Sequence, residues 1–164
     1  MFGSLKKLFG GEEKEEKIIA APVSGTAIPM GQVSDPTFSQ EILGKGTAVM
    51  PSDGRVVAPA DGLVTMVFDT KHAISMQTDN GAELIIHIGL DTVQLKGQYF
   101  EAHVAAGDKV KQGDLLLDFE IDKIKEAGYD VTTPVIICNT PQFPKMECRN
   151  GMEVKAGETA IIKL

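Results

Sequence analysis

Residues 71–89, KHAISMQTDNGAELIIHIG, contain two apolar runs on either side of a turn sequence. In residues 71–77 apolar and polar side chains alternate, which is typical of a β-strand with one buried face. Residues 83–89 are apolar on both faces and therefore predict a central strand. The polar segment 78–81 ends in Asn-Gly, a strong turn signal. The two runs thus predict an antiparallel hairpin with a histidine in each strand.

The rest of the chain, from Ile18 onward, consists of similar short apolar runs separated by Gly, Pro and Asp-Gly sequences. Such punctuation predicts an all-β fold, an antiparallel β-sandwich or barrel-like sheet, with one or two short helices. One helix is expected to have Asp35 as its N-cap and Pro36 as its first residue, and to end after two turns at Gly44. The other is expected over residues 122–128.

The chain has 164 residues, which allows one domain and a short tail. Residues 1–17 change from an apolar-basic segment to a charged run, so we expect a tail and linker there and the domain over residues 18–164. In residues 1–9 apolar side chains recur at helical spacing beside lysines, the composition of a weak anchor on an acidic membrane surface. The alternative is a disordered leader, since so short a helix is marginal in water.

Charge and composition exclude several classes of partner. The 16 Lys and Arg against 23 Asp and Glu give a net charge of −7, which repels phosphate backbones, so we expect no nucleic-acid partner. The sequence has no apolar run of ~20 residues and no signal-peptide pattern, which favours a cytoplasmic protein. Residues 1–9 leave open a peripheral contact with the inner face of the membrane. Cys138 and Cys148 are expected to be free thiols, with Cys138 buried.

The register of the hairpin decides whether its two histidines meet. A loop of two or four residues, centred between Asp79 and Asn80, places His72 directly opposite His87, with Cβ atoms ~4.5–5.5 Å apart. A loop of Asn80 and Gly81 makes them diagonal neighbours on one face of the sheet. A three-residue loop with a bulge turns one strand over and separates them. We expect one of the first two arrangements.

Two imidazoles in contact disfavour each other's charge, and each keeps a free ring nitrogen if its other nitrogen is bonded to the backbone. Three uses fit such a pair. It can bind a metal with Asp35 or Asp91 as third ligand, act as an acid–base pair, or provide a nucleophile with a neighbouring donor. Phosphoryl transfer requires a neutral nitrogen and a hydrogen-bond donor, and the pair supplies both without a metal.

Five segments resemble, in content and order, the glucose-specific enzyme IIA family of the bacterial phosphoenolpyruvate:sugar phosphotransferase system. Residues 81–93, GAELIIHIGLDTV, are similar to that family's phosphorylation-site signature; the other segments are 42–46, 58–62, 70–73 and 95–97. The resemblance extends from about residue 18 to the C-terminus. It implies an antiparallel β-sandwich of the duplicated hybrid motif type and a phosphotransferase component that carries phosphoryl groups during sugar uptake.

The resemblance also implies roles for individual residues. His87 resembles the histidine that accepts a phosphoryl group on Nε2 from the phosphocarrier HPr and passes it to a cysteine of enzyme IIB. His72 resembles the partner that stabilises this group without being phosphorylated, and Thr70 the hydroxyl that supports it. An apolar collar for docking of both partners and two acidic residues that meet an arginine of the donor are also implied. The collar residues are Phe38, Ile42, Phe68 and Val93, and the acidic residues are Asp35 and Asp91.

Two other hypotheses remain. A zinc-dependent hydrolase could use His72, His87 and an aspartate, and a lipoyl-type group carrier could use Lys123, because residues 113–123 resemble a lipoyl-domain hairpin. For the phosphocarrier we expect no required cofactor and no metal ligand set, so that zinc at the histidine pair would be adventitious or regulatory. The third histidine, His103, is expected to be solvated.

Overall fold

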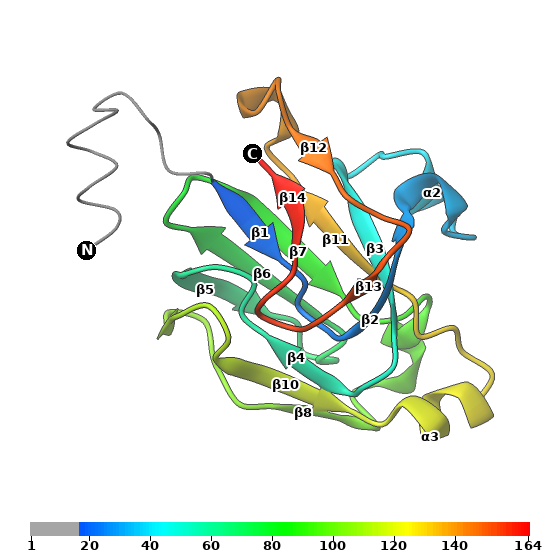
Figure 1. The fold of residues 1–164 in the computed structure, drawn as a ribbon. Helices are drawn as coiled ribbons and strands as arrows, with labels where there is room; N and C mark the ends of the chain where they lie inside the picture. The colour runs from blue at the N-terminus through cyan, green and yellow to red at the C-terminus, as the bar shows by residue number, and fades with distance from the viewer. Residues whose placement is uncertain (1–16) are drawn as a thin grey trace, which may run out of the picture.

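The structure, a computed structural model, describes residues 17–164 and consists mainly of antiparallel β-strands (Figure 1). The largest sheet has eight strands. Their order is β13 (Glu153–Val154), β2 (Gly25–Pro29), β3 (Lys45–Pro51), β11 (Thr133–Ile137), β7 (Glu83–His87), β6 (Ala73–Thr78), β5 (Gly62–Val67) and β9 (Lys109–Val110). β7 lies between β11 and β6, which confirms the central strand predicted from its apolar run.

Two further sheets have three strands each. One contains β1 (Ile18–Ala20), β14 (Ala160–Lys163) and β12 (Glu147–Cys148); the other contains β4 (Arg55–Val57), β10 (Leu115–Phe119) and β8 (Phe100–Ala102). Ile86 of β7, Leu117 of β10 and Ile161 of β14 are fully buried in one cluster, so all three sheets share a core. The all-β antiparallel sandwich is thereby confirmed.

Helical segments are short and lie at the periphery of the sheets (Figure 1). They are α2 (Pro36–Ser39), α3 (Ile121–Glu126) and the 3-10 turns η1 (Met30–Gln32), η2 (Thr92–Leu95) and η3 (Thr140–Gln142). Within residues 17–164 no helix has the length and apolar character required to cross a membrane. The predicted surface anchor, residues 1–9, lies outside the described residues.

The N-cap of the first predicted helix is confirmed, but its length was wrong. The Asp35 carboxylate accepts a hydrogen bond of 2.9 Å from the backbone N–H of Thr37. α2 then ends at Ser39 after a single turn instead of continuing to Gly44, because Glu41 takes a left-handed conformation with φ of 57°. The apolar residues that suggested a second turn therefore follow an irregular chain. The second predicted helix is confirmed as α3.

The predicted register of the β6–β7 hairpin was wrong by one residue. His87 pairs with Ala73, not with His72. The reason is a three-residue loop, closed by a 2.8 Å hydrogen bond from the N–H of Thr78 to the carbonyl of Ala82, with Gly81 at φ of 99°. β6 begins at Ala73, and the ladder continues one residue before it, where the N–H of Ile88 donates to the carbonyl of His72 at 2.6 Å.

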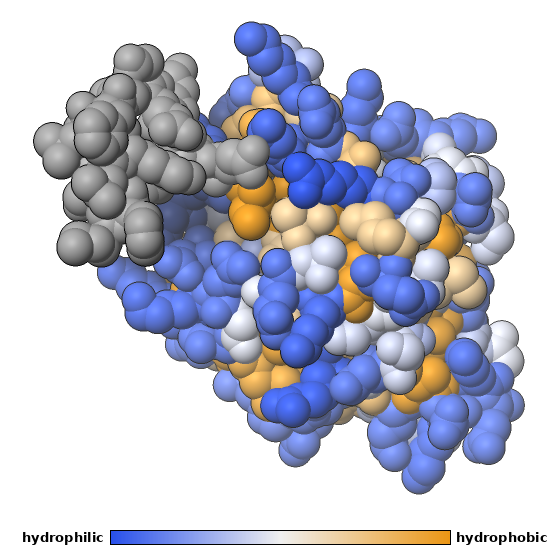
Figure 2. Space-filling view, viewed as in Figure 1, coloured by the Kyte–Doolittle hydropathy of each residue, from blue (hydrophilic) through white to orange (hydrophobic). Residues whose placement is uncertain are grey.

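Cys138 was predicted to be buried, but both cysteines are free and exposed. The apolar run that suggested burial belongs to β11, whose last residue is the fully buried Ile137. Cys138 follows the end of the strand, so it lies outside the core that the run builds. The face seen in Figure 2 is mostly hydrophilic, with several apolar patches.

Candidate functional site

The imidazole rings of His72 and His87 contact each other edge to face. Their centroids are 4.8 Å apart and their planes make an angle of 80°. The contact predicted from the sequence is thus confirmed, although it arises differently. The tight turn between β5 and β6, in which the N–H of Lys71 donates to the carbonyl of Phe68, brings His72 to the end of the sheet. Lys71 has φ of 60°, and this left-handed residue redirects the chain immediately before the histidine.

A backbone carbonyl determines which nitrogen of His87 is available. Nδ1 lies 2.8 Å from the carbonyl oxygen of Gly89, which can only accept a hydrogen bond. The neutral ring therefore carries its proton on Nδ1, and Nε2 keeps its lone pair. Nε2 is the nucleophilic nitrogen of this tautomer.

The segment after β7 fixes this carbonyl. The N–H of Gly89 donates to the carbonyl of Thr132, and that of Leu90 donates to the carbonyl of Asp130. The hydroxyl of the fully buried Thr92 donates to the carbonyl of Ile88 at 2.5 Å. The roles of Gly89 and Thr92 were not identified from the sequence, because Thr132 and Asp130 are distant along the chain. The Gly-x-x-Thr spacing was the one sequence signal that could have indicated them.

His72 is held by Thr70, as the resemblance implied. The Thr70 hydroxyl lies 2.5 Å from Nδ1 of His72, so the two groups share a hydrogen bond. When the hydroxyl donates, the proton of the neutral imidazole is on Nε2. His72 can then act as a donor through Nε2 while His87 acts as a nucleophile through its own Nε2.

Burial keeps both histidines neutral. Desolvation, together with a smaller effect of neighbouring His87, lowers the pKa of His72 from 6.5 to about 4. Desolvation also lowers the pKa of His87, against the opposing effects of its bond to Gly89 and of the Asp35 and Asp91 carboxylates. Two uncharged imidazoles can therefore receive an anion without first losing protons.

Two phenylalanines pack on the pair. The ring of Phe38 lies 4.8 Å from that of His87, and the ring of Phe68 lies 5.5 Å from that of His72. Phe38 is only 5% exposed and belongs to a small apolar cluster with Leu90. Phe38 thus packs against His87 as a buried residue, and its place in a docking collar stays a prediction of the resemblance.

The remaining residues predicted from the sequence are apolar docking residues and acidic residues, and the structure places each kind differently. Ile42 and Val93 are 66% and 48% exposed, which suits a docking surface. Asp35 and Asp91 both act on the pKa of His87, so the structure brings them to the histidine pair. Met66 is also exposed, at 50%, but the alternation of β5 gave no reason to single it out.

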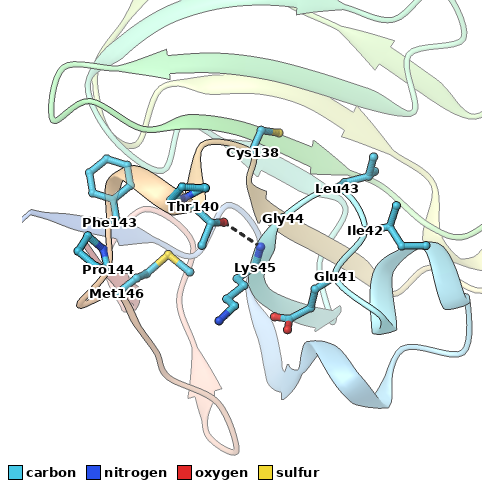
Figure 3. Close-up of a pocket in the computed structure, with 11 residues that line it drawn as sticks. Glu41, Ile42, Leu43, Gly44, Lys45, Cys138, Thr140, Phe143, Pro144 and Met146 are labelled. Carbon is cyan, nitrogen blue, oxygen red and sulfur yellow. Dashed lines mark hydrogen bonds between the residues drawn. The ribbon is translucent and has the colours of Figure 1, made fainter.

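A pocket of about 550 Å³ lies beside Ile42, between the 41–45 segment and the 138–146 loop (Figure 3). Cys138 and Met146 line it, and the backbone N–H of Lys45 donates to the Thr140 hydroxyl at 3.0 Å. Neither histidine of the pair lines this pocket. The histidine pair is therefore not part of this cavity.

The structure does not favour the two other hypotheses. Within residues 17–164, Glu101, His103 and Asp118 form the only group of three ligating side chains with all ligand atoms within 4.8 Å of one another. Neither His72 nor His87 belongs to this group. Lys123 lies in α3, where Nζ is 3.7 Å from Glu120, and not in the hairpin turn of a lipoyl-type carrier.

Comparison with known proteins gives concordant matches over nearly the whole chain. The chain is 46% identical over 167 residues to the "PTS system glucose-specific EIIA component" of Halalkalibacterium halodurans, covering 97% of this chain and 96% of that protein. The structure matches "Glucose permease IIA from Mycoplasma capricolum" with a TM-score of 0.82 and 34% identity, covering 91% of this chain and 96% of that one.

A third relative is a fused protein. The chain is 51% identical over 131 residues to the "PTS system beta-glucoside-specific EIIBCA component" of Bacillus subtilis (strain 168), covering 80% of this chain but 22% of that protein. The β-sandwich with its neutral histidine pair thus defines a component of a sugar phosphotransferase system. The chain belongs to the family described as phosphoenolpyruvate-dependent sugar phosphotransferase system, EIIA 1, whose model matches residues 17–143.

Proposed function

We propose that the protein is a glucose-type phosphocarrier whose His87 accepts a phosphoryl group on Nε2 from phospho-HPr and passes it to a cysteine of an enzyme IIB domain. The observation that carries this proposal is the 2.8 Å contact between Nδ1 of His87 and the carbonyl of Gly89. This contact leaves Nε2 unprotonated beside a second neutral imidazole. Family membership and the glucose-specific relative support the same conclusion.

Each transfer exchanges one bond to phosphorus for another. In the first, the lone pair of His87 Nε2 forms an N–P bond as the bond between phosphorus and the donor breaks. In the second, a cysteine thiolate of enzyme IIB forms an S–P bond, and the electron pair of the N–P bond returns to Nε2. The transition state of phosphoryl transfer is loose, so the protein acts mainly by aligning donor and acceptor. A nitrogen at the end of a central strand is suited to this.

His72 acts as a positioning donor. With Thr70 bonded to its Nδ1, Nε2–H of His72 donates to an oxygen of the phosphoryl group on His87. The low pKa of His72, about 4, keeps this donor uncharged at neutral pH. An uncharged donor binds the phosphoryl oxygens without holding them too tightly for onward transfer.

The surface around the pair serves docking. Exposed Ile42 and Val93, together with Phe68, exclude water around the phosphoryl group and offer one apolar contact to both partners. Asp35 and Asp91 attract an arginine of the donor. A partnership with enzyme IIB is further supported by relatives named EIIBCA components, which carry a matching segment.

In this scheme the transfer requires no cofactor, because the donor supplies the phosphoryl group and the two histidines supply the nucleophile and the hydrogen bond. Zinc bound at His72 and His87 would inhibit by occupying Nε2. Since both partners act at the cytoplasmic side of sugar uptake, we place the protein in the cytoplasm, with residues 1–9 as its peripheral contact with the membrane.

Intact mass tests the proposal. The chain is incubated with phosphoenolpyruvate, enzyme I and HPr, and we expect one added phosphoryl mass that survives base and is lost in acid. His87→Ala should abolish it, whereas Lys123→Ala should retain it. His72→Gln should still accept the group but pass it slowly to enzyme IIB. An added phosphoryl group that persists in His87→Ala would refute the assignment.

A further inference from the structure

The side chains of Glu101, His103 and Asp118 converge on one face of the β8–β10 ladder. Glu101 pairs directly with Asp118 across the two strands, and His103 lies two residues beyond Glu101, on the same face. The backbone N–H of His103 donates to the carbonyl of Leu116 at 2.9 Å, which extends the ladder past the end of β8. The register therefore fixes these three side chains as neighbours.

The distances within this cluster suit a shared cation. Nε2 of His103 is 2.7 Å from Oδ2 of Asp118 and 3.8 Å from Oε1 of Glu101. All three ligand atoms lie within 4.8 Å of one another. Zinc ligands at ~2.0–2.2 Å from the metal are separated by roughly 3.3 Å in a tetrahedral site, so small side-chain rotations suffice.

The electrostatics of the ladder also favour a cation. Like charges directly opposite each other on neighbouring strands destabilise a sheet, and Glu101 and Asp118 are such a pair. Arg55 lies opposite Asp118 on the other side, in β4, and offsets part of this repulsion. The opposite face of the same strands is occupied by buried Phe100 and Leu117, so the carboxylates cannot turn away into the core. A divalent ion between them would relieve the repulsion.

We infer that Glu101, His103 and Asp118 form a binding site for a divalent transition-metal ion, with Zn²⁺ as the typical occupant. The imidazole nitrogen favours zinc over magnesium or calcium, and the two carboxylates balance its charge. When the ring proton is on Nδ1, Nε2 of His103 binds the ion in place of its hydrogen bond to Asp118. The side chains are 34%, 41% and 76% exposed for His103, Asp118 and Glu101, so water completes the coordination and the ion exchanges freely.

This site belongs to the β4–β10–β8 sheet, whereas His87 ends β7 and His72 immediately precedes β6 in the eight-stranded sheet. Zinc binding at the two places must therefore be separated in the experiment. The full chain carrying His72→Gln and His87→Gln serves as the background. We expect this background to bind one equivalent of Zn²⁺ in titration calorimetry.

Variants of the cluster then test each ligand. Loss of a residue that only hydrogen-bonds a metal ligand costs ~10–100-fold in metal affinity, so loss of a direct ligand through His103→Gln should weaken binding at least about tenfold. Glu101→Gln and Asp118→Asn should each weaken it as well. Glu126→Gln removes the same charge from an exposed position on α3 and should leave the affinity unchanged.

A second measurement does not depend on the folding of variants. In the unmodified chain, the ring resonances of His103 should shift during a Zn²⁺ titration followed by histidine-selective NMR. Absence of zinc binding in the His72→Gln/His87→Gln background would overturn the inference. So would equal affinity after His103→Gln, or a His103 ring that is unmoved by saturating zinc.

Discussion

Substitution of Gly89 by alanine tests how the loop after β7 holds His87, the residue that we propose to be phosphorylated. Gly89 has φ of +82°, and a Cβ there would lie 2.5 Å from Cγ2 of Thr92 and 2.9 Å from the carbonyl oxygen of Asp130. The left-handed conformation costs a non-glycine residue roughly 1–2 kcal/mol, and overpacking adds about 1–3 kcal/mol. We therefore expect Gly89→Ala to reduce the free energy of unfolding by about 2–5 kcal/mol.

Two further variants separate these contributions. Gly107 has φ of +97° but nothing within 4 Å of a built Cβ, so Gly107→Ala should show only the backbone cost of roughly 1–2 kcal/mol. Thr92→Ser removes the Cγ2 atom that a methyl group at position 89 would strike and keeps the hydroxyl that donates to Ile88. Combined with Gly89→Ala, it should restore part of the stability, with a coupling of about 0.5–3 kcal/mol.

The assays are urea denaturation of all variants and the initial rate of phosphorylation by phospho-HPr. The Gly89 carbonyl bonds Nδ1 of His87, so its displacement should slow phosphorylation, by up to ~100-fold for a shift near 1 Å. Gly107→Ala should react at the rate of the parent. The reasoning is refuted if Gly89→Ala and Gly107→Ala lose equal stability, or if Thr92→Ser adds its own cost to that of Gly89→Ala without recovery.

Three other predictions concern the side chains of the site. The pKa of His72 is lowered from 6.5 to about 4 in the folded protein, so the unfolded chain binds more protons between these values. This contribution to the free energy of unfolding, up to about 3 kcal/mol, is fully present above pH 6.5 and is lost as the pH falls toward 4. The lowered pKa of His87 acts in the same direction. In urea denaturation, the stability of His72→Gln should therefore depend less steeply on pH than that of the parent. Phe38→Ala should lower the free energy of unfolding by about 3–5 kcal/mol, because residue Phe38 is only 5% exposed. Ile42→Ala, at a 66% exposed position, should change it by less than about 0.5 kcal/mol but slow transfer to enzyme IIB. Thermal unfolding measures the first effect and a coupled transfer assay the second. Thr70→Val removes the hydroxyl from Nδ1 of His72 and should slow onward transfer about 3–10-fold in rapid-quench measurements, while Thr70→Ser should not; equal rates for both would contradict the role of the hydroxyl.

The features that could be predicted from the sequence are those set by local chemistry. Asp35 caps a helix because its side chain reaches an N–H two residues away, and the central position of β7 follows from an apolar run on both faces. Both signals lie within a few residues of the structure they specify. The resemblance to a known family then added Thr70, whose contact with His72 is also local.

The features that were missed depend on conformations that side-chain patterns do not reveal. Lysine has no special preference for the left-handed region, yet Lys71 adopts it at φ of 60°. In the observed register, strict alternation would place the His72 and His87 side chains on opposite faces of the sheet. The left-handed turn at Lys71 lets the two rings meet. The carbonyl groups that fix Gly89 come from residues 130–132, some forty positions along the chain. Such contacts appear only when the sheet is assembled.

The charge pattern around the pair connects fold, stability and transfer. In the proposed function, phosphorylation of His87 would place negative charge beside Asp35 and Asp91, which would raise the energy of the phosphorylated form and so favour onward transfer. The same two carboxylates make the empty site attractive to a basic donor, in a protein with a net charge of −7. A buried cationic histidine would hold the phosphoryl group more firmly, but desolvation prevents this by lowering the pKa of His72 to about 4. Under the proposed function, neutral hydrogen bonds would hold the phosphoryl group, and repulsion by the two carboxylates would keep this binding weak enough for onward transfer.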